Sequence, residues 1–238
     1  MRRFFFAAAM CTVLFFSSCD VIQQLPGNVA TSTQGANPVE AAAGIREALN
    51  NGVLQAVTKF NTVDGFFKDA VYKILLPPEA KKIENTLRSL GFNQLADNAI
   101  LSINRGAEDA AGYAKPIFAN AIRQMTIQDA IGLVRNGDTS ITHYFRTKAS
   151  AELYSAFRPV IEKSLQKVDA TKYYGDLINK YNSLPTTFNK LNPDLSGYVT
   201  ERATAALFDR IRVEEKNIRN NFAARTSTLL QKVFSGNY

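Results

Sequence analysis

The side chains of this sequence that could do chemistry are a few charges on otherwise apolar helical surfaces. Glu214 lies within the apolar stripe of the longest helical pattern, about 20° from Leu207 when each residue turns the helix by about 100°. A carboxylate in such a place must be paired or protonated, because burying it alone costs many kcal/mol. The arginines that could pair with Glu214 are Arg210, one turn earlier, and Arg105, Arg146 and Arg225 from other segments.

This set of one carboxylate and four arginines is open to three interpretations. It is an internal ion-pair network that fixes helix register, a polar pocket for an anionic or zwitterionic group, or, with Glu214 or Asp129 as acid or base, the centre of a carboxylate-dependent hydrolase. We expect Glu214 to be buried and to meet Arg225 or Arg105 from elsewhere in the chain. Arg210 precedes Glu214 in the less favourable orientation for a pair four residues apart.

Other catalytic and metal chemistries find no support in the sequence. His143 is the only histidine, and no acid is clearly paired with it, as an activated serine or cysteine would need. The sequence has no G-x-S-x-G motif, no cluster of Cys and His with zinc-ligand spacing, and no glycine-rich phosphate loop. We therefore predict no catalytic residue, no metal site and no cofactor, and a surface or half-buried packing role for His143.

The first residues have the layout of a bacterial export signal. A basic start at Arg2-Arg3 precedes a short apolar run and then Ser17-Ser18-Cys19. The run is too short to span a bilayer, which takes roughly 20 residues. The residues before Cys19 resemble a lipobox, in which the cysteine is acylated, with chains such as palmitate, and becomes the new N-terminus. The alternative is an ordinary cleaved signal peptide with a chance cysteine.

The sequence thus predicts a signal peptide over 1–18, a lipidated cysteine and flexible tether over 19–37, and a helical domain over 38–238. Two or three acyl chains, at about 0.8 kcal/mol per buried CH₂, would make release from a membrane negligible. We expect a protein of the bacterial cell envelope that faces the periplasm. The sequence does not distinguish between the inner and the outer membrane as the site of the anchor. The net charge is +7, and +5 without Arg2 and Arg3. This compartment argues against nucleic acid, so a basic body suggests anionic lipid headgroups, envelope polymer or an acidic protein as partners.

From Pro38 onward every periodic segment has helical spacing, which predicts an all-α fold with little or no sheet. We expect a single domain of roughly ten helices packed around one long C-terminal helix over 194–221, with Asp194 as its N-cap. A proline pair favours an extended connector over 71–78. The other expected helices cover 39–60, 79–90, 93–111, 115–125, 126–136, 138–145, 150–168, 173–184 and 226–234.

Two further patterns bear on packing and binding. Small residues from Ala99 to Ala110 share one face of their helix, which predicts a seam where another helix approaches closely. Aromatic residues crowd the third of the chain between Tyr144 and Phe208, where tyrosines could line a pocket or belong to the core. A roomy cavity beneath this aromatic third would favour a binding protein over a scaffold.

Several short segments carry a family resemblance: Leu101–Glu108, Met125-Thr126 with Asp129-Ala130, Tyr144–Arg146, Asn192–Leu195 with Tyr198–Thr200, and Glu214–Lys216 through Ala224–Thr226. Together they resemble a bacterial family known as domain of unknown function 4197. The resemblance implies a helical protein of the exported or lipoprotein type, and it implies no reaction. We therefore expect a membrane-tethered, non-catalytic envelope lipoprotein that binds a partner protein or an amphiphilic or anionic ligand. The alternatives are a purely structural lipoprotein and a carboxylate-dependent hydrolase.

The export signal gives a first prediction. Replacing Cys19 by alanine should leave an unprocessed or soluble form, because the acylated sulfur and the cleavage site are lost together. Intact mass of the membrane-extracted protein measures this directly, and an unmodified N-terminus at a residue other than Cys19 in the wild type would refute lipidation.

Overall fold

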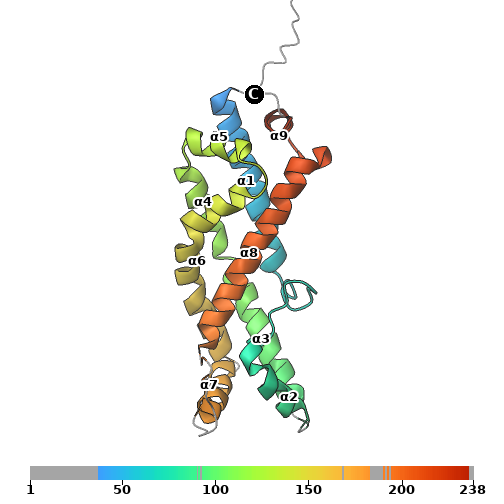
Figure 1. Ribbon diagram of the computed structural model, residues 1–238, viewed down its shortest axis with the longest axis vertical. Helices are drawn as coiled ribbons and strands as arrows, with labels where there is room; N and C mark the ends of the chain where they lie inside the picture. Colours follow the sequence, from blue (N-terminus) through green and yellow to red (C-terminus); the bar gives the residue numbers. More distant parts are fainter. Residues whose placement is uncertain are drawn as a thin grey trace, which may run out of the picture. The chain divides into compact units, whose positions relative to one another are not determined.

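Helices make up all the regular structure that the computed structural model describes, which covers residues 37–235 apart from 90, 92, 168, 183–189, 191 and 193; no strand occurs among these residues. The α-helices are α1 (Pro38–Phe60), α2 (Lys81–Ser89), α3 (Asn93–Ala111), α4 (Ala114–Gln124), α5 (Ile127–Arg135), α6 (Ser140–Gln166), α7 (Ala170–Asn182), α8 (Leu195–Asn220) and α9 (Thr228–Val233), with 3₁₀ turns η1 (Pro78–Ala80) and η2 (Phe222–Ala224) (Figure 1). The predicted all-α class is confirmed. The predicted signal peptide, Cys19 and all of the predicted tether except Asn37 lie outside the described residues.

The predicted arrangement of roughly ten helices around one long C-terminal helix is wrong. The helices expected over 138–145 and 150–168 form the single helix α6, because Ser150 is surrounded by residues that tolerate a helix and no proline or glycine separates the two stretches. With 27 residues α6 is longer than α8, which has 26 and is followed by α9. α8 shares the centre of the fold with α1, α3 and α6, all of which pack against it.

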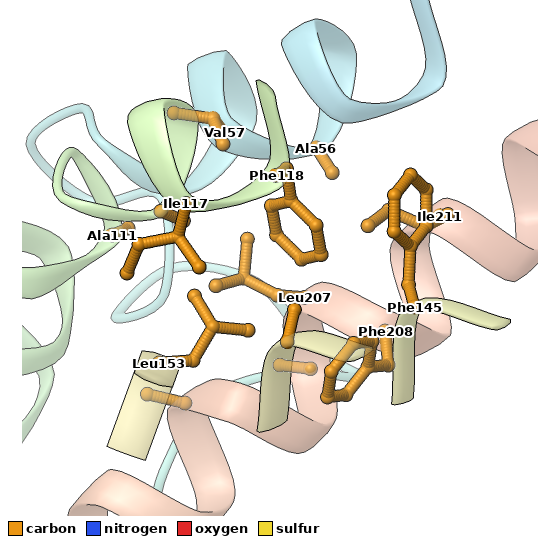
Figure 2. Close-up of a cluster of buried hydrophobic side chains, with 14 of the residues drawn as sticks. Ala56, Val57, Ala111, Ile117, Phe118, Phe145, Leu153, Leu207, Phe208 and Ile211 are labelled. Carbon is orange, nitrogen blue, oxygen red and sulfur yellow. The ribbon is translucent and has the colours of Figure 1, made fainter. Parts of the chain in front are cut away.

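The apolar core forms where these helices bring their stripes together. Figure 2 shows side chains from α1, α3, α4, α6 and α8 converging on one cluster. Phe118 of α4 meets Phe145 of α6 and Phe208 of α8 edge to face, with ring centroids 5.0 and 5.9 Å apart. Such pairs add about 0.5–1.5 kcal/mol each beyond the burial of their area. The small-residue face of α3 packs against α6, with Ile103, Ala107 and Ala110 fully buried.

The start of α6 is capped by a side chain from another helix. Thr139, which precedes α6, has a left-handed φ of 76° and makes no side-chain cap. Glu215 of α8 accepts hydrogen bonds from the backbone N–H groups of Ile141 at 3.2 Å and Thr142 at 3.1 Å, and from the Thr142 hydroxyl at 3.0 Å. These N–H groups belong to the first turn of α6 and have no partner within the helix. The helix expected to start at residue 138 therefore begins at Ser140, and Asp138 does not cap it.

Arg219 completes this polar centre one turn further along α8. It donates to the Glu215 carboxylate at 3.0 Å, to the Leu133 carbonyl of α5 at 2.7 Å and to the Ser140 hydroxyl at 3.0 Å. The side chains of Glu215 and Arg219 are 1% and 10% exposed. The ion pair between Glu215 and Arg219 connects α8 with α5 and α6, and each charged group also has hydrogen-bond partners outside α8.

Polar side chains of α3 hold the connector between α1 and η1, residues 61–77. Asn104 is fully buried, and its amide accepts from the Ile74 N–H at 2.9 Å and donates to the Ile74 carbonyl at 2.8 Å, as a neighbouring strand would. Glu108, 5% exposed, accepts from the N–H groups of Phe66 at 3.0 Å and Phe67 at 3.1 Å. Residues 73–75 form neither helix nor turn, in keeping with the extended connector expected over 71–78, whereas residues 70–72 form a turn and Pro78 begins η1. Side chains of α3 fix the path of the connector.

The helix expected over 226–234 is observed as α9, and it packs against the first turns of α1. Leu230 and Val233 are fully buried, and Gly44 of α1 lets α9 approach, since a Cβ there would lie 2.7 Å from a Val233 methyl group. Lys232 pairs with Glu40 at 2.7 Å across the same contact.

The connector gives a second prediction. Replacing Asn104 by alanine should lower the free energy of unfolding by about 2 kcal/mol, because the buried N–H and carbonyl of Ile74 lose their partner. Asn98→Ala, at an exposed position of the same helix, is the matched control and should stay within about 0.5 kcal/mol of wild type. Chemical denaturation measures both, and equal stabilities of the two variants would contradict the role given to Asn104.

Candidate functional site

The structure places Glu214 in the core of the fold with a partner from its own helix. Glu214 is 5% exposed, and its carboxylate accepts from a guanidinium nitrogen of Arg210, one turn earlier on α8. The expectation that Arg225 or Arg105 would reach it is wrong. The orientation rule for exposed pairs gives way here, because a buried carboxylate takes the nearest donor that can reach it.

The other arginines of the predicted set lie in separate places. Arg105 of α3 pairs with Asp64 of the connector at 2.7 Å and with Glu108 on its own helix at 2.5 Å. Arg225 donates to two carbonyls at the C-terminal end of α8, at 3.1 and 2.8 Å. Arg146 lies over the ring of Phe208, 5.6 Å from its centre. The structure thus brings together only Glu214 and Arg210, and the contacts of the set are those of an internal network that fixes helices.

A shallow hollow of about 530 Å³ on α5 and α6 collects His143, Tyr144 and Asp129. Asp129 accepts from the Thr126 N–H at 3.0 Å in the capping box of α5, and this backbone hydrogen bond, with that to the Thr126 hydroxyl, holds the pKa of the Asp129 carboxyl below its usual value. Within the described residues no acid is hydrogen-bonded to His143, and no group of three or more His, Cys, Asp and Glu could hold a metal ion. The hollow contains the elements of neither a catalytic triad nor a metal centre.

The helices α6, α7 and α8 meet at one end of the bundle (Figure 1). A deeper cavity of about 330 Å³ is lined by residues of these three helices. Tyr154 of α6, Tyr174 of α7 and Tyr198 of α8 supply three phenols, so we call it the tyrosine cavity. The remaining described residues of its wall are Pro77, Glu79, Lys190, Asn192, Asp194, Gly197 and Glu201. Three of its wall residues belong to the aromatic third of the chain, where a roomy cavity is the feature expected of a binding protein and not of a scaffold.

The N-terminus of α8 fixes one side of the tyrosine cavity. Asp194 caps the helix by accepting from the Gly197 N–H at 2.8 Å, as its position before the helix predicts. Its other oxygen accepts from Arg158 of α6 at 2.9 Å, and the same guanidinium nitrogen contacts the Tyr154 hydroxyl at 2.9 Å. Gly197 is needed here, because a Cβ at this position would lie 2.4 Å from the Asp194 carboxylate.

The phenols of Tyr174 and Tyr198 stay protonated at neutral pH. Burial, with the nearby charge of Glu79 and then Tyr198, raises the pKa of Tyr174 to about 12. Burial also raises the pKa of Tyr198, while Arg202 acts in the opposite direction and Glu79 in the same one. The cavity therefore offers neutral aromatic walls, with hydroxyl groups that can donate or accept a hydrogen bond, beside carboxylates.

The sequence anticipated only part of this site. Its three tyrosines belong to the predicted aromatic cluster, but Glu79, Arg158 and Glu201 were not singled out. Glu201 could have been found, because it follows Tyr198 by three residues and therefore shares its face of α8. Glu79 lies 119 residues before Tyr198 in the sequence, and only the fold of the connector brings it to the cavity.

Comparison with known proteins gives one match. Residues 36–235 match the model of a family described as "Protein of unknown function (DUF4197)". Neither the curated proteins nor the solved structures contain a match. In the described part of the chain, all helices are too short or too polar to cross a membrane.

The buried ion pair gives a third prediction. Glu214→Gln should lower the free energy of unfolding by roughly 2 kcal/mol, less than a fully buried pair would lose, because Arg210 keeps some access to water. This corresponds to a fall of about 4–8 °C in melting temperature. The same substitution at exposed Glu201 on the same helix should leave the melting temperature unchanged. A Glu214→Gln variant as stable as wild type would remove the structural role of the pair.

Proposed function

The chain belongs to the DUF4197 family of proteins of unknown function, and from this premise we propose that it is a lipid-anchored protein of the bacterial cell envelope whose helical body binds a ligand without transforming it. The tyrosine cavity is the binding site in this proposal. The observation that carries it is a concave, tyrosine-walled space of about 330 Å³, within the range of small-molecule sites, at about 300–1,000 Å³.

The anchor in this proposal is supported by the first residues of the sequence. A basic start, a short apolar run and small residues before Cys19 fit lipoprotein export. Eighteen residues separate Cys19 from Pro38, and a flexible chain of that length spans about 23 Å root mean square. The body could therefore turn freely above the membrane with its cavity open to the periplasm.

A hydrolytic role is less well supported than binding. The two carboxylates considered for it, Glu214 and Asp129, are engaged in an ion pair and in a capping box. A general acid or base has to reach a substrate. A carboxylate that is held in an ion pair or in a helix cap has little freedom to do so. The tyrosine cavity itself holds no pair of nucleophile and base among its described residues.

The fourth prediction tests binding at the cavity. Glu201 is exposed and lines the cavity, so Glu201→Trp should fill the space without disturbing the core. Native mass spectrometry of the lipidated protein in mild detergent should show a non-covalent ligand on wild type and on Glu162→Trp, an exposed site of α6 outside the cavity wall. The adduct should be lost in Glu201→Trp. Wild type without any adduct, together with a crystal structure whose cavity holds only water, would favour the scaffold alternative.

A further inference from the structure

The charges around the tyrosine cavity are not those of an anion site. The described residues of its wall include three carboxylates, those of Glu79, Asp194 and Glu201, and one lysine, Lys190. Asp194 is neutralised by Arg158 at 2.9 Å. Glu79 and Glu201 make no hydrogen bond or ion pair with any residue that the structure describes, so the described wall keeps one net negative charge after Lys190 is counted. Arg202, whose charge acts on Tyr198, is not among the described wall residues. An anionic ligand would be repelled here, and a cation would be attracted.

The aromatic walls favour the same sign of charge. The face of a tyrosine ring carries negative electrostatic potential and attracts a cation placed within about 6 Å of its centre. The wall already shows this preference, because the guanidinium of Arg158 lies 6.0 Å from the centre of the Tyr154 ring. Tyr174 and Tyr198 come from two other helices, and no cation of the described chain lies over either ring. Their pKa values lie above the usual tyrosine value, so their rings act as neutral phenols.

We infer that the tyrosine cavity binds its ligand through an organic ammonium group, held by Glu79 and Glu201 and by the tyrosine rings. The inference rests on the proposed binding function and assigns it a ligand class. It also changes the sequence-based expectation of an anionic ligand, because the arginines behind that expectation are engaged elsewhere. The cavity is large enough for a small amine or for the headgroup of a zwitterionic phospholipid, which share this chemistry.

The test compares two probes of the same shape. Choline carries a quaternary ammonium, and 3,3-dimethylbutan-1-ol has a carbon atom in place of the nitrogen and no charge. Calorimetric titration of the mature, lipidated protein should show choline binding at least tenfold more tightly than the alcohol. Glu79→Gln and Glu201→Gln should each weaken choline binding about fivefold and leave binding of the alcohol unchanged. Glu162→Gln, outside the cavity, should behave as wild type, and equal melting temperatures would show that all variants are folded.

The outcomes separate the ligand class from the proposed function. Equal affinities for choline and the alcohol, both lost in Glu201→Trp, would overturn the ammonium inference and leave the cavity as a binding site. Tighter binding of inorganic phosphate than of choline would do the same. If choline, the alcohol and phosphate all fail to bind to wild type, both proposals fall. Vesicles of phosphatidylcholine, but not of phosphatidylglycerol, should compete with choline if the natural ligand is a lipid headgroup, and neither should compete if it is a soluble amine.

Discussion

The fold depends on one buried carboxylate that belongs to two helices at once. Glu215 is part of α8 by sequence, but it satisfies the unpaired N–H groups at the start of α6, and Arg219 extends the contact to a carbonyl of α5. Because an apolar stripe alone permits neighbouring helices to slide along each other by a turn, a directional contact of this kind selects one position. The aromatic contacts of Figure 2 are then formed at that position and at no other.

The same device recurs at the connector, where α3 contributes Asn104 and Glu108 to backbone that has no helix of its own. In each case a helix supplies hydrogen bonds that the neighbouring backbone cannot supply to itself, which lets irregular chain approach the core without unpaired polar groups. The consequence reaches the tyrosine cavity, since the connector leads directly into η1 and so determines where Glu79 stands. The segment of the sequence from Leu101 to Glu108, which carries part of the family resemblance, thus positions a residue of the candidate site from a distance.

Helical periodicity predicted what depends on neighbours in sequence. It gave the all-α class, the cap at Asp194, the last helix within 226–234 and a buried position for Glu214. It could not give the partner of Glu214 or the role of Glu215, because both follow from how helices meet in space. The sequence also predicted a helix boundary before Ser150 that the structure does not have. Serine is a good N-cap, but it is also tolerated within a helix, and only the packing of the whole of α6 decides whether Ser150 starts a helix or continues one. The sequence showed the tyrosines of the cavity as part of the aromatic cluster, whereas Glu79 lies 119 residues before Tyr198 in the sequence and reaches the cavity only through the fold.

The junction of α1 with α9 has a mechanical consequence. A pull on the chain ahead of Pro38 enters the folded body at the start of α1, and its component along the helix axis loads α1 lengthwise. The 23-residue helix α1 packs against α4, α5, α8 and α9. Lys232 of α9 forms an ion pair with Glu40 in the first turn of α1. Load applied in this direction has to shear the whole apolar stripe past its neighbours together, whereas a pull across the axis would unzip the helix one turn at a time. The contacts along α1 thus resist a lengthwise pull together rather than one after another.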